Sequence, residues 1–174
     1  MRFTLCLAAA AATLVTAGPA MAQAVGSASA QAYAKGTVVQ PVSLVWQQDL
    51  DFGTVVSTAV AGNVVIDADT GGRTVGGGVV AVPSYPGGRA LFQGNGAAAQ
   101  TVQLSFTQPA VLVSTANPLD LVTVNSMSLD SGGATRVIGP SGVFNVGVGG
   151  DFQIGANQAP GLYRALFTVT AVYQ

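Results

Sequence analysis

The chain has 174 residues, of which only 7% are charged, with six basic and seven acidic residues and a formal net charge of −1. So few scattered basic residues exclude nucleic acid as a partner, because phosphate contacts need clustered Lys and Arg. The chain holds neither histidine nor glutamate, and this leaves few groups for proton transfer or metal binding. We therefore expect a protein that is not an enzyme and uses no cofactor.

Residues 1–22 have the pattern of a secretory signal peptide. Arg2 precedes a short apolar run that ends in the small-residue triplet AMA, so we expect cleavage before Gln23 and export to the periplasm, the cell surface or the medium. The only cysteine, Cys6, lies in this segment, which leaves no disulfide in the mature chain. No later segment offers about 20 uninterrupted apolar residues, so no transmembrane segment is expected after cleavage.

The mature chain opens with an alanine-rich segment, residues 23–38. Alternate positions in ASAQAYAK place four alanines on one face of an extended chain, namely Ala28, Ala30, Ala32 and Ala34. This pattern fits a first strand, a strand donated to another chain or a flexible leader. Burying four alanines stabilises a sheet by about 3 kcal/mol, where valine or leucine would give about 6 to 12. A stronger apolar set follows immediately, from Val38 to Val45.

Residues 39–174 form one predicted domain. Apolar-alternating segments follow one another with turn residues roughly every 8 to 12 positions, which predicts an all-β antiparallel sandwich. The segments are VVQPVSLVW, LDFGTVV, GNVVIDA, GGVVAVP, ALFQGN, QTVQLSF, LVTVNSMSL, GVFNVGVGG, DFQIGA and LYRALFTVTAVY. Turns are predicted at the glycine clusters 71–72, 76–78, 87–88, 132–133 and 149–150.

Two short motifs look like reactive or binding sites. DSGG at 130–133 resembles the surroundings of a nucleophilic serine, but without histidine no general base is at hand, and a turn is the better interpretation. DADTGG at 67–72 begins like a calcium loop with Asp67 and Asp69, although Gly78 stands where such a loop needs a glutamate. We treat these aspartates as weak metal candidates against a simple hairpin turn.

Four segments in order resemble a known family: LDFGTVV, GNVVIDADTGGRTVGGGVV, LFQGNGAAAQTVQLSF and FNVGVGGDFQIGANQAPGLYRALFTVTAVYQ. They are similar to the secreted bacterial family called domain of unknown function 4402, over nearly the whole mature chain. The most specific parts are Leu50–Gly53 and Val146–Tyr173. The family name carries no function.

The end of the chain also resembles chaperone-usher pilin subunits, which finish on an alternating strand with a penultimate tyrosine and a glycine fourteen positions from the end. Tyr173 and Gly161 stand there in this chain. The resemblance implies an immunoglobulin-like sandwich lacking one strand, which a periplasmic chaperone and then a homologous subunit supply by β-strand addition. It implies strand-pairing positions at Gly161, Phe167, Val169, Ala171 and Tyr173, and a donor strand carrying the four alanines.

The sequence thus favours a secreted, non-catalytic structural or adhesive surface protein that self-associates in a fimbria-like way. Two other classes stay open. A soluble sandwich could bind a ligand on its loops, with Trp46, Tyr85 and Tyr163 as stacking residues. A small outer-membrane barrel would also end on an alternating strand. The sequence does not decide whether the N-terminal segment pairs within its own chain or with a neighbour.

Overall fold

The computed structural model describes residues 26–174, so the predicted signal peptide lies outside the described residues. The described residues include no helix that is long and apolar enough to cross a membrane. The strands are β1 (Ser43–Gln48), β2 (Val55–Ile66), β3 (Arg73–Ala81), β4 (Ala90–Asn95), β5 (Thr101–Phe106), β6 (Val111–Ser114), β7 (Leu121–Leu129), β8 (Thr135–Val137), β9 (Val143–Ile154), β10 (Tyr163–Arg164) and β11 (Val169–Tyr173).

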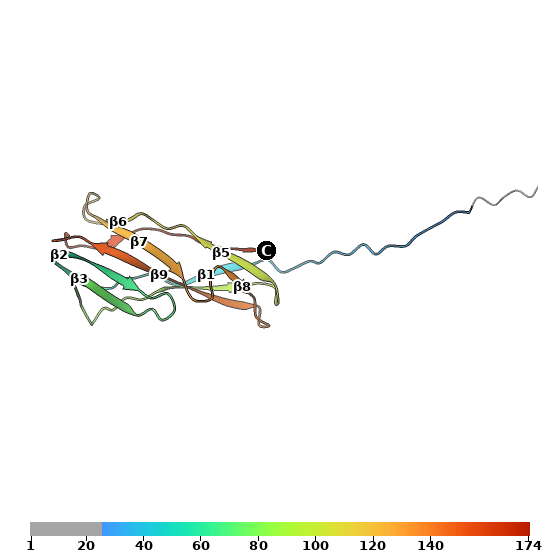
Figure 1. Cartoon of the computed structure of the whole chain (residues 1–174), viewed down its shortest axis with the longest axis horizontal. Helices are drawn as coiled ribbons and strands as arrows, with labels where there is room; N and C mark the ends of the chain where they lie inside the picture. The colour runs from blue at the N-terminus through green and yellow to red at the C-terminus, as the bar shows by residue number, and fades with distance from the viewer. Residues whose placement is uncertain (1–25) are drawn as a thin grey trace, which may run out of the picture. The chain divides into compact units, whose positions relative to one another are not determined.

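The strands form two antiparallel sheets, as Figure 1 shows. The larger sheet runs in the order β1-β4-β9-β7-β6-β10, and the β2–β3 hairpin joins it through β9. The smaller sheet has the order β11-β5-β8. The predicted all-β sandwich is therefore confirmed. Its short, Gly-punctuated and alternating strands are those typical of antiparallel sheets with one face on a core.

Strand β9 is the central strand of the larger sheet. Its first half pairs with β4, its second half pairs with β2, and β7 lies along its other side. The predicted turn at residues 149–150 is wrong, because both glycines lie inside this strand. They serve a close approach instead: a Cβ on Gly149 would stand 2.3 Å from the Ile66 carbonyl oxygen. The cluster at residues 76–78 likewise lies in a strand, where Gly77 has a φ of 66°.

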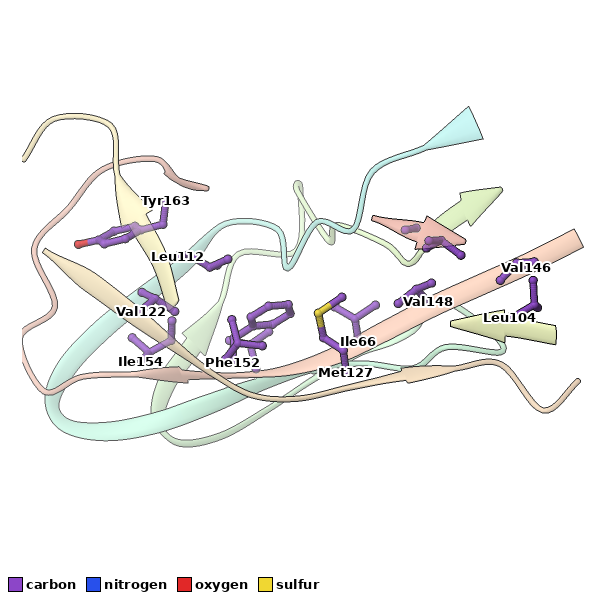
Figure 2. Close-up of a cluster of buried hydrophobic side chains, with 14 of the residues drawn as sticks. Ile66, Leu104, Leu112, Val122, Met127, Val146, Val148, Phe152, Ile154 and Tyr163 are labelled. Atoms are coloured by element: carbon purple, nitrogen blue, oxygen red, sulfur yellow. The ribbon is translucent and has the colours of Figure 1, made fainter. Parts of the chain in front are cut away.

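The core fills the space between the sheets with the inward side chains of alternating strands (Figure 2). Its largest fully buried side chains are Ile66, Leu104, Ile138, Val64, Val102, Val122, Val146 and Val148. Most come from β2, β5, β7 and β9, so the long-range pairing of these strands brings the core together. Glycines make room within it, since a Cβ on Gly94 would lie 2.1 Å from the Phe144 ring.

The last segment of the chain, residues 163–173, crosses from one sheet to the other. Its first part is β10, which pairs with β6 in the larger sheet, and its last part is β11, which pairs with β5 in the smaller one. Side chains alternate along the whole segment. Phe167, Val169, Ala171 and Tyr173 face inward, and Leu166, just before them, is 97% exposed. We call this segment the C-terminal strand.

Residues 26–42 belong to no strand. The four alanines of the predicted donor strand lie here, and their side chains are exposed. A strand needs a neighbour, because its backbone N–H and C=O groups otherwise bond only to water. No strand among the described residues pairs with this segment. We call residues 26–41 the N-terminal arm.

Candidate functional site

A long open groove runs along one side of the sandwich. One wall is formed by residues 46–57, which include the end of β1 and the start of β2, and the other by residues 158–167. The groove has a volume of about 1330 Å³, whereas voids in packed protein interiors rarely exceed one water molecule. It is also larger than the roughly 300 to 1,000 Å³ typical of small-molecule pockets. A groove of this size fits a segment of polypeptide better than a small metabolite.

The floor of the groove is the hydrophobic core itself. Leu112, Val122, Met127, Phe152 and Ile154 line it from strands β6, β7 and β9. All five are buried core residues, and they appear together in Figure 2. The apolar surface that an occupant would cover therefore belongs to half-buried residues of the walls, among them Phe52, Ala165 and Phe167, and covering it is favourable at about 25 cal/mol per Å².

Aromatic pairs connect the walls of the groove to strands β9 and β4 of the larger sheet. The Phe52 ring lies 5.4 Å from the Phe152 ring, measured between centroids. The Phe92 ring meets the Phe167 ring edge to face at 6.1 Å. Aromatic pairs prefer such tilted or edge-to-face geometries. Each wall of the groove is therefore packed through an aromatic ring against the larger sheet.

The C-terminal strand presents a free backbone edge to the groove. The Leu162 and Thr168 carbonyls and the Gln174 N–H bond to the β5–β6 side at 2.8 to 3.0 Å. Because backbone groups alternate along an antiparallel strand, the odd-numbered residues point their N–H and C=O the other way. Within residues 26–174 these groups have no backbone partner. They belong to Tyr163, Ala165, Phe167, Val169, Ala171 and Tyr173.

Both ends of the groove are closed by hydrogen bonds. At one end, the Ser57 hydroxyl donates to the Gln158 carbonyl at 3.1 Å, and the Asn157 N–H donates to the Thr58 carbonyl at 2.7 Å. At the other end, the Tyr173 hydroxyl donates to the Gln40 carbonyl at 2.6 Å. The two walls therefore run antiparallel, with a gap between them where an added strand would complete the sandwich.

The Tyr173 hydroxyl has a second partner, the Ala97 N–H, which donates to it at 2.7 Å. This penultimate tyrosine thus joins the C-terminal strand to the loop after β4 and to the base of the N-terminal arm. Gly161, the other position taken from the pilin resemblance, has a φ of 155°, which side chains rarely adopt. It lies in the groove wall, just before the strand begins.

Charged residues stand on the rim of the groove. Asp49 and Asp51 lie on one wall and Arg164 on the other, and all three are exposed. The Trp46 indole N–H donates to the Asp49 carboxylate at 3.0 Å. Of the aromatic residues considered for ligand stacking, Trp46 and Tyr163 line the groove but Tyr85 does not. Tyr163 is buried, and its hydroxyl donates to the Ala159 carbonyl at 2.6 Å.

The weak metal candidates form a hydrogen-bonded turn. The Asp67 carboxylate accepts the Thr70 N–H at 2.7 Å and the Thr70 hydroxyl at 2.8 Å, and these bonds lower the pKa of its carboxyl. The Asp69 carboxylate accepts the Ser131 N–H at 2.6 Å, which lowers its pKa in the same way. No group of three His, Cys, Asp or Glu residues within 26–174 is placed to hold a metal ion.

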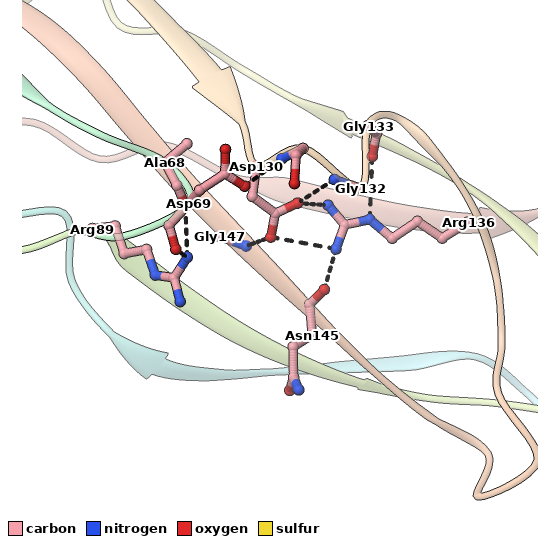
Figure 3. Close-up of polar contacts among 10 residues, drawn as sticks. Ala68, Asp69, Arg89, Asp130, Gly132, Gly133, Arg136, Asn145 and Gly147 are labelled. Atoms are coloured by element: carbon pink, nitrogen blue, oxygen red, sulfur yellow. Dashed lines mark hydrogen bonds and ion pairs between the residues drawn. The ribbon is translucent and has the colours of Figure 1, made fainter. Parts of the chain in front are cut away.

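The DSGG motif belongs to a network that ties loops together (Figure 3). The Asp130 carboxylate pairs with Arg136 and accepts the Gly147 N–H at 2.7 Å. The side chains of this ion pair are 16% and 11% exposed. Arg89 donates to the carbonyls of Ala68 and Asp69. Each polar group in the network therefore has a structural partner, and the serine of the motif joins it through its backbone.

The family is decided by a comparison of the sequence with protein-family models. Residues 42–173 match the model described as a domain of unknown function, DUF4402. The chain belongs to this family. No curated protein and no solved structure matches it. The matched region of this DUF4402 protein contains both walls of the groove and all its floor, and it begins after the N-terminal arm.

Sequence reasoning missed the floor of the groove and the rim. Strand alternation marks Val122 and Phe152 as inward-facing, but it gives no signal that a gap lies over them, because a gap depends on which strands pair. Gly161 and the inward residues of the C-terminal strand, by contrast, do lie along the groove or its free edge. The arm alanines belong to no strand and are exposed.

Proposed function

We propose that this protein is a secreted, non-catalytic structural or adhesive subunit that assembles in a fimbria-like way, by accepting a strand from another chain into its groove. The observation that carries the proposal is the free edge of the C-terminal strand above an apolar floor. An added strand would bond to six residues along this edge, at about 0.5 to 1.5 kcal/mol net for each hydrogen bond, and would cover the half-buried apolar side chains of the walls at the same time.

A strand edge with unpaired backbone groups normally needs protection from pairing with other chains. Proteins guard such edges with charges, prolines, bulges or a covering element, because an open edge is a template for association. Between Tyr163 and Tyr173 the only charged residue is Arg164, and the segment contains no proline. The whole chain also carries few charges, so charge repulsion between copies does little to oppose association. An unprotected edge therefore supports strand addition as the purpose of the groove.

The proposal is tested on material sheared from cells that express the full-length chain. Samples are compared by electrophoresis with and without boiling and then imaged by negative stain. A heat-sensitive ladder at multiples of the mature mass, together with filaments, is the expected result. A single band that boiling does not shift, without filaments, would overturn assembly and favour the ligand-binding module, for which Trp46 at the groove rim is the candidate contact.

A further inference from the structure

We infer that a polar pocket on the outward face of the larger sheet binds a neutral saccharide. The pocket lies where β1, β4 and β9 run side by side, and its volume is about 360 Å³. Small-molecule pockets range from roughly 300 to 1,000 Å³, so the pocket has the size for one sugar unit. Its lining consists of Gln47, Arg89, Leu91, Phe92, Gln93 and Asn145.

Strand alternation places this pocket on the opposite face from the groove. Phe92 turns its ring toward Phe167 on the groove side, so its neighbours Leu91 and Gln93 face outward. Gln93 pairs directly with Asn145 of β9, and directly opposed residues have Cβ atoms about 4.5 to 5.5 Å apart. Two carboxamides therefore stand side by side, next to the apolar Leu91. The inference goes beyond the proposed function and does not depend on it.

A β-bulge brings a third carboxamide to the pocket. Trp46 pairs with Phe92 and Gln48 pairs with Leu91, which leaves Gln47 as an extra residue without a partner on β4. A bulge bends its strand and re-aims a side chain, and Gln47 joins the pocket lining. In the part of the chain that the structure describes, none of the three carboxamides takes part in a hydrogen bond, and all three residues are exposed.

Arg89 adds a guanidinium group that is held from one side. Its Nη1 donates to the Ala68 carbonyl at 2.8 Å and also to the Asp69 carbonyl. Figure 3 shows another nitrogen of this group turned away from these carbonyls. Arg89 forms no ion pair with any carboxylate within residues 26–174. Gly147 leaves room for the arrangement, because a Cβ there would lie 2.5 Å from the Ala68 carbonyl oxygen. Arg89 thus keeps guanidinium hydrogens for a ligand.

The charges around Arg89 favour a neutral ligand over an anion. Hydrogen bonds from Thr70 and Ser131 are the main cause that lowers the pKa of the Asp67 and Asp69 carboxyls, and the nearby charge of Arg89 lowers both further. The Arg136 guanidinium donates to the Asn145 carbonyl and is paired with Asp130. Two cations therefore stand among three carboxylates, and such a set creates no positive field that would attract an anion.

The chemistry of the lining matches the hydroxyl groups of a sugar. A carboxamide both donates and accepts hydrogen bonds, and so does a hydroxyl group, whereas a guanidinium only donates. A saccharide carries hydroxyls around its ring and C–H groups on its faces. The three carboxamides and Arg89 can bind the hydroxyls while Leu91 contacts the C–H groups. This combination of an apolar contact with a few placed polar groups is typical of small-molecule sites.

Saturation-transfer NMR tests the pocket, because it detects the bound sugar whether the chain is monomeric or assembled. The exported chain is mixed with methyl glucoside, methyl galactoside or methyl mannoside, and with glucuronate as the charged counterpart. We expect a saturable signal from at least one of the neutral glycosides. Its dissociation constant should be about 1 mM, as ordinary ligand efficiency gives for about 13 non-hydrogen atoms.

Substitutions of the carboxamides locate the bound sugar. Gln93→Ala and Asn145→Ala should each weaken binding roughly 2- to 13-fold, which corresponds to the loss of one hydrogen bond. Asn125→Ala is the matched control, because it removes an exposed carboxamide from β7, outside the pocket lining, and should leave binding unchanged. All three substituted residues are exposed, so each variant should keep the melting temperature of the unmodified chain.

The other outcomes overturn the inference. Silence from all three neutral glycosides does so, and so does a signal from glucuronate alone, which would indicate a site for anions. A signal that neither Gln93→Ala nor Asn145→Ala weakens would place the sugar elsewhere, and its loss in Trp46→Ala would place it at the groove rim. The heat-sensitive ladder is a separate readout: the pocket variants should keep it, and its absence from the unmodified chain overturns the proposed function but not the pocket.

Discussion

Filling the groove from within should block assembly and stabilise the monomer. Ala165 lies on the groove wall with its side chain facing inward and half-buried, so Ala165→Trp should place an indole over the apolar floor. An indole that buries half of its roughly 200 Å² gains about 2.5 kcal/mol at 25 cal/mol per Å². An incoming strand must displace it, which weakens strand binding by about 60-fold. The heat-sensitive ladder should therefore fade while the melting temperature of the monomer rises.

Val172→Trp is the matched control. It introduces the same side chain on the outward face of the same segment, at a position that is 52% exposed and lies outside the groove lining, and should leave both ladder and melting temperature unchanged. Tryptophan fluorescence should be blue-shifted for the inward variant and not for the control. The reasoning fails if Ala165→Trp destabilises the monomer, as overpacking of a filled core would, or if both variants assemble alike.

Four other predictions follow from the same contacts. Tyr173→Phe leaves the Ala97 N–H and the Gln40 carbonyl without their partner. It should lower the free energy of unfolding by about 1 to 3 kcal/mol, measured as a lower urea midpoint of the monomer. An unchanged midpoint would contradict the stabilising role of these two hydrogen bonds. Asp130→Ala removes the carboxylate that pairs with Arg136 and should lower the free energy of unfolding by about 2 to 3 kcal/mol in the same assay. A loss below about 0.5 kcal/mol, roughly that of a surface substitution, would refute the structural role of the network. The folded pKa values of Asp67 and Asp69 lie below the ordinary 3.8. The stability that these two carboxylates add is therefore complete above that pH and is lost as the pH falls through the folded pKa values. The melting temperature of Asp67→Ala should depend less on pH below pH 4 than that of the unmodified chain, and an identical pH profile would exclude this cause. Deleting residues 23–35 should remove the ladder without reducing the exported monomer, and normal polymers from the deletion would show that the arm is dispensable.

The alternation of small and apolar residues was sufficient to predict the fold class and the inner face of the C-terminal strand. Phe167 and Val169 point inward for a reason that acts over two residues, because successive side chains on a strand take opposite faces. The prediction of a turn from a glycine pair failed at Gly149 and Gly150. Glycine marks either a turn or a close approach, and only the position of Ile66 across the strand shows that here it is the second.

The groove could be decided only by the tertiary structure. Whether Ala165 and Ala171 keep free backbone groups depends on β5 and β6 taking one edge of the C-terminal strand while no strand takes the other. That outcome comes from pairings between residues far apart in the chain, as does the position of Met127 and Phe152 on the groove floor. The sequence by itself determined which faces are apolar, through local periodicity. The tertiary structure determined which apolar face lacks a cover, because a missing neighbour leaves no trace in the strand that lacks it.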